Sequence, residues 1–213
     1  MPTVSLIVST YNWKEALALT LRSIAAQTVL PLEVIVADDG SRADTGEMIR
    51  EMAKDFPVAL KHVWQEDTGF RLARVRNLGI AASKGEYVIF LDGDLILHPD
   101  FVADHLALIR PGIHLQGGRL NASPEESTRL LDGGKPRFGP FMPGKFKRKH
   151  ALRLPWLAAR KARTAEGGQV MGCNMGMWRK DLDLVNGFDD NYEGWGREDK
   201  DLAVRASRRS AAR

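Results

Sequence analysis

The stretch Tyr87-Val-Ile-Phe-Leu91-Asp92-Gly93-Asp94 joins a run of apolar, strand-forming side chains to two carboxylates that are one residue apart. A buried parallel strand that ends in paired acids presents them at its carboxyl end, where open α/β sheets bind ligands. Gly93 lets the backbone approach a ligand closely, and two hard oxygen donors suit Mg²⁺ or Mn²⁺ carrying a diphosphate. An Asp-Gly pair is also common in hairpin turns, so the rest of the chain must decide between the two interpretations.

Through the first half of the chain, apolar β-rich runs alternate with helical patterns. The pattern predicts strands at residues 4–9, 33–37, 58–63 and 87–91, and helices at residues 13–27, 45–54 and 72–83. Continuous apolar strands that alternate with helices are typical of an α/β fold with a parallel sheet and helices on both faces. Right-handed crossovers then bring the loops that follow the strands to one edge of the sheet.

Beyond Pro99 the pattern weakens. Residues 111–143 are rich in Gly, Pro and polar side chains, and we expect them to be irregular. A short helix is predicted at residues 181–186 with Gly187 at its C-terminal cap, and a further helix runs from the acids at 198–199 through Val204. Residues 205–213 are poor in apolar side chains, and we expect no packed strand or helix there.

The composition is that of a globular protein, and 213 residues can hold one good-sized core. The net charge of +4 is uneven, because residues 144–163 carry eight basic side chains and no acidic one. Apolar residues between these charges favour peripheral contact with anionic lipid, while nucleic acid binding and a solvated loop are the alternatives. No apolar run is long enough to span a bilayer, and no signal peptide is expected. The single cysteine, Cys173, favours a reducing, cytoplasmic location.

Several side chains at the expected loop edge suit a nucleotide. Tyr11 can stack on a nucleobase such as uracil, and Asp38 or Asp39 can accept its hydrogen bonds. Arg74 or Arg76 can reach the base or a diphosphate through a planar fork of donors. Taken singly, the two acids are typical of a helix-capping turn and the arginines of a solvated helix face. Their order on successive units of one sheet favours a nucleotide site.

Five segments together resemble the family 2 glycosyltransferases of the GT-A fold. Four of them match the general family, at residues 4–12, 34–41, 69–79 and 88–94. The fifth, residues 186–199, is similar to the acceptor-side motif of galactosyltransferase-type and chondroitin-polymerase-type members. The resemblance extends from Val4 to about Arg205 and implies a mostly parallel, nucleotide-binding sheet between helices. Residues 1–110 would form the nucleotide-sugar-binding half, and residues 111–213 an irregular acceptor-side half of the same domain.

The resemblance also implies a role for each matching residue. The nucleotide would be held by Thr10, Tyr11, Asn12, Asp38, Asp39, Asp92 and either Arg74 or Arg76. Asp94 would ligate Mn²⁺ or Mg²⁺ directly, with Asp92 on the ribose or on the metal. Asn174 and Met175 would line the donor-sugar and acceptor side, and Trp195 would be a mobile flap over the donor. Glu198 would orient an acceptor hydroxyl, and Asp199 would be the base that deprotonates it.

The implied reaction transfers a sugar, with inversion, from a nucleotide sugar (a UDP-sugar) to a hydroxyl of a glycan or lipid-linked acceptor. Glu198 and Asp199 are also consistent with acids that complement a helix dipole. Relatives carry a later histidine that completes the metal shell, whereas this chain has none after His150. Either the chain is truncated, or another residue or water fills that position.

Two other functions stay open. A nucleotidyltransferase should carry a Gly-rich, basic phosphate loop after the first strand, where this chain has Ser9-Thr-Tyr-Asn12. An inactive nucleotide-sugar-binding module is also consistent with the fold, because fold does not imply function. Nucleic acid is not expected as a partner.

Overall fold

The structure is a computed structural model that describes residues 1–139, 153 and 170–211. The basic segment at 144–163 lies outside the described residues apart from Arg153, which pairs with Asp100 and Asp104. The predicted contact with anionic lipid therefore stays a prediction. No helix in the described part of the chain is long and apolar enough to cross a membrane.

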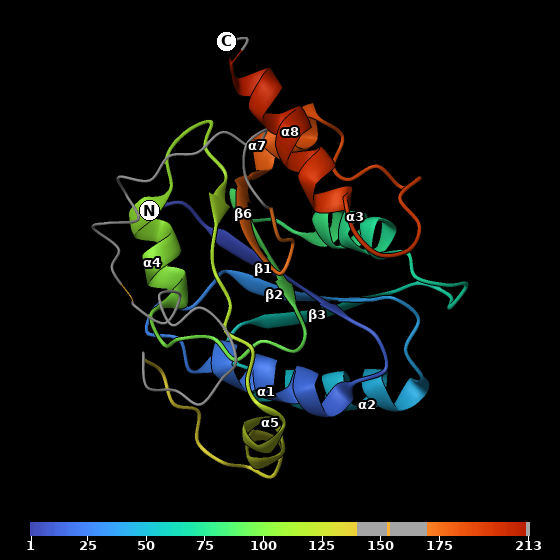
Figure 1. The fold of residues 1–213 in the computed structure, drawn as a ribbon, viewed down its shortest axis with the longest axis vertical. Coiled ribbons are helices and arrows are strands. Elements are labelled where there is room, and N and C mark those ends of the chain that lie inside the picture. Colours follow the sequence, from blue (N-terminus) through green and yellow to red (C-terminus); the bar gives the residue numbers. More distant parts are fainter. Residues whose placement is uncertain (140–152, 154–169, 212–213) are drawn as a thin grey trace.

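A six-stranded sheet forms the centre of the molecule, in the order β3-β2-β1-β4-β6-β5 (Figure 1). The first four strands are parallel, as predicted, and they are β1 (Val4–Thr10), β2 (Glu33–Asp38), β3 (Ala59–Trp64) and β4 (Tyr87–Asp92). Two later strands pair antiparallel, namely β6 (Asn174–Trp178) on β4 and β5 (Leu115–Gln116) on β6. The sequence did not predict these two, because β5 is only two residues long and β6 contains a glycine and no β-branched residue.

Helices cover both faces of the sheet (Figure 1). One face carries α1 (Lys14–Ala25), α2 (Ala43–Ala53) and α4 (Phe101–Leu108). The other carries α3 (Leu72–Ala82), α7 (Arg179–Leu184) and α8 (Glu198–Ala211). The strand period of two explains both cores, because Leu6 and Val8 face the first set of helices while Ile7 faces the second. The predicted helices after β1, β2 and β3 are confirmed within two residues.

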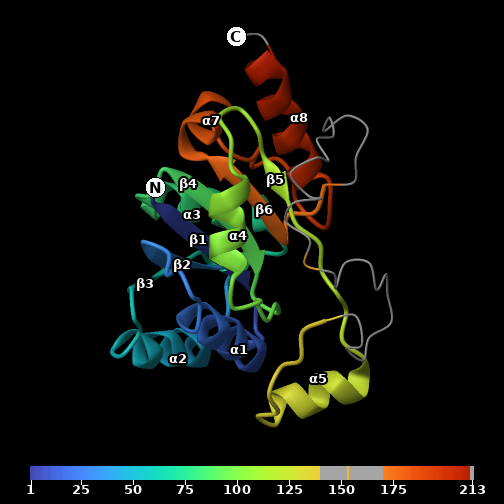
Figure 2. The same ribbon diagram turned by 90° about the vertical axis from the view of Figure 1, so that its left-hand side faces the viewer.

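The prediction that residues 111–143 are irregular was wrong in part. The segment contains β5 and a helix, α5 (Pro124–Leu131), which lies apart from the sheet in Figure 2. Ser123 caps this helix by accepting a hydrogen bond from the amide of Glu126 at 3.2 Å. A serine three residues before a glutamate, with proline directly after the serine, is a recognised helix start and was the missed signal. Helix α4 was also missed.

The ends of α7 and α8 differ from the predictions. The first left-handed residue after α7 is Asn186 (φ 57°), and Gly187 follows it one position later (φ 65°). The amide of Gly187 donates to the carbonyl of Leu182 at 2.9 Å, which completes a Schellman motif. The predicted unpacked tail is helical as far as Ala211, because Leu202 and Ala206, four residues apart, bury one face of α8.

Candidate active site

The acid pair Asp92-Gly93-Asp94 lies at the carboxyl end of β4 and does not close a hairpin, since β4 pairs parallel with β1. The amide of Gly93 donates to the carbonyl of Ser9 at 2.7 Å, and a Cβ on Gly93 would lie only 2.8 Å from that oxygen. Glycine is therefore required here by the close approach of two backbones. The contact brings the loops after β1 and β4 together and leaves Asp94 exposed at the edge of the sheet.

Asp38 is fully buried and holds its own loop. One of its oxygens accepts from the amide of Ser41 at 2.8 Å, and the other lies 2.9 Å from Nε2 of His62 on β3. The Ser41 hydroxyl in turn accepts from the amide of Asn12, which ties the loops after β1 and β2 together. Asn12 has a left-handed backbone (φ 48°), which asparagine tolerates better than most residues. The buried side chain of Asp38 therefore stabilises the loop that follows β2.

Asp39 faces a different set of partners, which the sequence analysis missed. Its carboxylate accepts from the amide of Arg71 at 2.9 Å and from the side-chain amide of Gln65. Burial raises the pKa of the Asp39 carboxyl, and the Gln65 hydrogen bond opposes this rise. Oε1 of Gln65 and Nε of Arg71 are buried and have no hydrogen-bond partner among the described residues. An unpaired acceptor and an unpaired donor beside a carboxylate are groups that a polar ring such as a nucleobase can satisfy.

The last residue of β1, Thr10, and the first residue of the following loop, Tyr11, border this cluster. Thr10 is buried, and its carbonyl accepts from the amide of Asp39 at 3.0 Å. Tyr11 is half exposed, and its hydroxyl donates to Asp67 at 2.9 Å. The hydrogen bond to Asp67 thus holds a half-exposed Tyr11 ring at the edge of the sheet.

Arg76 lies in the interior of the site, where only 1% of its surface is exposed. Its NH2 group donates to Asp92 at 3.1 Å, and its NH1 group donates to Glu198, the first residue of α8, at 3.2 Å. Arg74, on the same helix, is exposed and forms no hydrogen bond or ion pair with another described residue. Of the two candidate arginines, only Arg74 therefore has a guanidinium free for a nucleotide.

The donor set at β4 fits a divalent cation. Burial raises the pKa of the Asp92 carboxyl, Arg76 opposes this rise, and the negative charge of Asp94 adds to it. The repulsion between the two carboxylates is what a bound cation relieves. Arg119 approaches the second oxygen of Asp92 at 3.8 Å. Both oxygens of Asp92 therefore already lie near an arginine, and Asp94 is the carboxylate of the pair with fewer protein partners. Within the described ranges, no group of three or more His, Cys, Asp or Glu side chains is placed to hold a metal ion.

The second acid pair opens α8, as predicted. Glu198 is buried, burial raises its pKa against the effect of Arg76, and its Oε2 has no hydrogen-bond partner in the described structure. Asp199 is half-buried, and its Oδ2 accepts from the amide of Gly172 at 2.8 Å. Trp195 is 93% exposed between two glycines with left-handed backbones, Gly194 and Gly196. This loop therefore presents an aromatic side chain that is not packed against the core.

The two residues assigned to the sugar side lie on opposite faces of β6. Asn174 contacts His105 of α4, its Oδ1 lying 3.2 Å from Nε2 of the imidazole. The side chain of Met175 is fully buried in the core on the other face and is not exposed at the loop edge, so its assignment to the sugar side stays a prediction. The alternation of side chains along a strand is the physical reason that the two side chains lie on opposite faces.

We expect His105 to make the stability of the fold depend on pH. Its burial lowers its pKa from 6.5 to about 4, so the unfolded chain takes up a proton first as the pH falls. The free energy of unfolding should therefore decrease between about pH 6.5 and pH 4, by roughly 3 kcal/mol in total from this group. Denaturant titrations at several pH values should show this loss in the wild type and a smaller one in His105→Gln, which does not titrate. Parallel pH curves for the two proteins would contradict the prediction.

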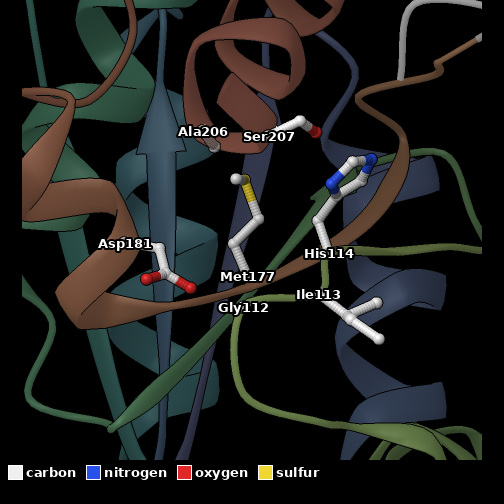
Figure 3. A pocket seen from close by; sticks show the side chains of 7 residues that line it. All are labelled: Gly112, Ile113, His114, Met177, Asp181, Ala206 and Ser207. Carbon is white, nitrogen blue, oxygen red and sulfur yellow. The ribbon is translucent and has the colours of Figure 1, made fainter. Parts of the chain in front are cut away.

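A hollow at the opposite edge of the sheet is separate from these acids. Figure 3 shows the residues that line it, which come from β6, α7, α8 and the segment before β5: Gly112, Ile113, His114, Met177, Asp181, Ala206 and Ser207. Met177 pairs with Val88 near the amino end of β4, whereas Asp92 lies at the carboxyl end. The candidate active site is thus the loop edge, and this hollow is not part of it.

Comparisons with known proteins identify the family to which this chain is similar. The sequence model of glycosyl transferase family 2 matches residues 5–183, and that of the N-terminal domain of galactosyltransferase matches residues 158–211. Chondroitin synthase of Escherichia coli is 32% identical over 230 aligned positions, which cover 96% of this chain and 32% of that protein. Validoxylamine A glucosyltransferase of Streptomyces hygroscopicus subsp. limoneus is 28% identical, with 96% and 48% covered. The chain thus spans 32% and 48% of the lengths of these two relatives.

Solved structures show the same fold. TarS 1-349 of S. aureus, in complex with UDP-GlcNAc, superposes with a TM-score of 0.66 at 21% identity, over 96% of this chain and 53% of that one. Mannosyltransferase PcManGT from Pyrobaculum calidifontis, in complex with GDP-Man and Mn²⁺, gives 0.64 at 22% identity, with 96% and 52% covered. The fold is therefore GT-A, as the resemblance implied. Because the family 2 model matches most of its length, this chain belongs to glycosyl transferase family 2.

Proposed function

We propose that this chain transfers a sugar from a nucleotide sugar, a UDP-sugar, to a hydroxyl of a glycan or lipid-linked acceptor, with inversion at the anomeric carbon. The observation that carries the proposal is the meeting of two acid pairs at one edge. Asp92 and Asp94 end β4, Glu198 and Asp199 begin α8, and a buried Arg76 bridges the two pairs. In metal-assisted, inverting sugar transfer, one acid pair would hold the cation at the leaving diphosphate and the other would take the proton of the acceptor.

The nucleoside would bind at the ends of β1 and β2. The unpaired polar atoms of Gln65 and Arg71 beside Asp39 would pair with the nucleobase, and the half-exposed ring of Tyr11 would stack on it. Arg74 is exposed on α3 and would contact the diphosphate. In this proposal Arg76 and Asp38 do not contact the nucleotide but hold other protein groups in place.

The acid pair on β4 would hold Mn²⁺ or Mg²⁺. Asp94 would be the direct ligand, with Asp92 and the diphosphate of the donor providing further oxygens. The bound cation supplies Lewis-acid stabilisation of the charge that grows on the leaving diphosphate. The chain's own contribution is to place Asp92 and Asp94 rigidly, through the contact of Gly93 with Ser9.

On the acceptor side, Asp199 would take the proton of the attacking hydroxyl, and Glu198 would orient that hydroxyl through its unpaired Oε2. The amide of Gly172 fixes the Asp199 carboxylate and leaves lone pairs for a proton. A single base and a single displacement lead to inversion. The loop with Trp195 would close over the donor and exclude water, since flanking glycines permit the backbone change.

The test begins with a thermal-shift screen of nucleotide sugars in Mn²⁺, because a ligand that binds the native state raises the melting temperature. The sugars that stabilise the protein are then assayed for release of nucleoside diphosphate, with Mn²⁺ and with a chelator. We expect a uridine nucleotide sugar to bind and to be cleaved only with the metal. Binding without any metal-dependent release would favour the inactive nucleotide-sugar-binding module, and absence of binding would overturn the proposal.

A further inference from the structure

The guanidinium of Arg76 donates hydrogen bonds from all three of its nitrogens to residues of three elements. Its Nε donates to the hydroxyl of Ser9 at the end of β1, at 3.2 Å, and its NH1 and NH2 groups donate to Glu198 and Asp92. Its Cζ lies 5.5 Å from the centre of the Phe188 ring, which covers its face. Because only 1% of its surface is exposed, this side chain is covered by the protein.

The backbone around Arg76 is shaped to admit it. A Cβ on Gly172 would lie 2.5 Å from NH1 of Arg76, so only a glycine leaves room for the guanidinium there. The amide of the same glycine donates to Asp199. The two acids at the start of α8 are thus held by neighbouring groups. Glu198 accepts a hydrogen bond from Arg76, and Asp199 accepts one from Gly172, which lies beside the guanidinium.

We propose that Arg76 is a positioning residue that sets the distance between the carboxylate Asp92 on the donor side and the acid pair of α8, and that it is not a ligand of the nucleotide. This inference rests on the proposed function. A planar fork with fixed angles between its N–H groups can hold two carboxylates at a defined separation, whereas the ammonium of lysine is a point charge on a flexible stem. Lysine at this position should therefore fail to restore activity.

The main experiment compares Arg76→Gln and Arg76→Lys with the wild type, using the nucleotide sugar that the wild type turns over. We expect kcat to fall by at least about tenfold in both variants, while the KM for the donor and the calorimetric affinity for UDP stay within about twofold. Arg205→Lys is the control, since Arg205 lies farther along α8 and pairs with Asp201 away from the acids. It should leave kcat within about twofold.

A double-mutant cycle tests whether Arg76 acts through Glu198. The effect of Arg76→Gln combined with Glu198→Gln on kcat should not exceed the larger of the two single effects, because both break the same contact. Multiplicative effects, or a loss of UDP affinity of more than about tenfold in the Arg76 variants alone, would overturn the proposal. Full activity of Arg76→Lys would overturn it as well.

Two measurements keep the test valid if Arg76 variants fold poorly or no donor is found. Ser9→Ala removes only the acceptor of Nε, and we expect a several-fold lower kcat at unchanged UDP affinity. Hydrogen exchange of the ligand-free protein should show faster exchange of the first turn of α8 in Ser9→Ala and Arg76→Gln than in the wild type, with β1 and β4 unchanged. This exchange does not depend on turnover, so it distinguishes failure of the positioning role from failure of the proposed function. Wild-type turnover and exchange in Ser9→Ala would overturn the proposal.

Discussion

Asp94→Asn is expected to abolish sugar transfer and to remove the effect of Mn²⁺ on nucleotide binding. The substitution keeps the size of the side chain but removes a hard anionic ligand from the exposed end of β4. Asp92 is expected to compensate poorly, because Arg76 and Arg119 already approach its two oxygens. Turnover should fall by about three orders of magnitude or more, since the leaving diphosphate loses its charge stabilisation.

The measurements for Asp94→Asn are initial rates in Mn²⁺ and calorimetric titration of UDP with and without the metal. Asp55→Asn is a matched control, because Asp55 is an exposed aspartate in the turn after α2. The control should behave as the wild type in both assays. An Asp94→Asn protein with wild-type turnover in Mn²⁺ would mean that the acid pair has no metal role.

Asp199→Asn is expected to lower kcat while leaving the binding of the nucleotide nearly unchanged. The amide cannot accept the proton of the acceptor hydroxyl, so kcat should fall by about 10²–10⁴-fold. UDP affinity and its dependence on Mn²⁺ should change little, because Asp199 lies at the start of α8 and not among the partners of Asp92. A loss confined to kcat marks an interaction used in the transition state.

Asp201→Asn is the matched control for the base. Asp201 also lies in the first turn of α8, where any acid stabilises the helix dipole, but its carboxylate pairs with Arg205. If Asp199 only complemented the dipole, both substitutions would lower the free energy of unfolding slightly and leave kcat intact. Equal loss of donor binding in Asp94→Asn and Asp199→Asn would contradict the proposed division of labour between the two acid pairs.

Much of the fold was predictable from local patterns. Apolar runs of five or six residues that alternate with helical spacing predicted β1 to β4 and the three helices after β1, β2 and β3. The signal is strongest for β1, β2 and β4, which bury continuous apolar surface, whereas the edge strand β3 is only half-buried. The elements that escaped prediction carry weaker patterns. Strand β6 has a glycine in its centre, which approaches Tyr87 closely, and its pairing with β4 comes from residues 82 or more positions away in the chain.

In the candidate site, too, some residues were predictable from the sequence and others were not. The acids at 92–94 were predicted from their position after an apolar strand, and those at 198–199 from the resemblance of residues 186–199 to the acceptor-side motif. The partners of these acids were not identified. Gln65 and Arg71 reach Asp39 only because β3 lies beside β2, and a sequence pattern alone gives no sign of that side-chain contact.

By itself, the sequence therefore determined where the four parallel strands lie, and that their polar ends share one edge, because these properties depend on the periodicity of neighbouring residues. Tertiary structure alone decided what each charged residue does there. Arg76 and Arg74 are two positions apart on one helix, yet one is buried between carboxylates and the other is exposed. The contact that separates their roles joins Arg76 to Glu198 across 122 positions. Burying a guanidinium is favourable only when the fold brings carboxylates to it, so that role follows from packing and not from local sequence.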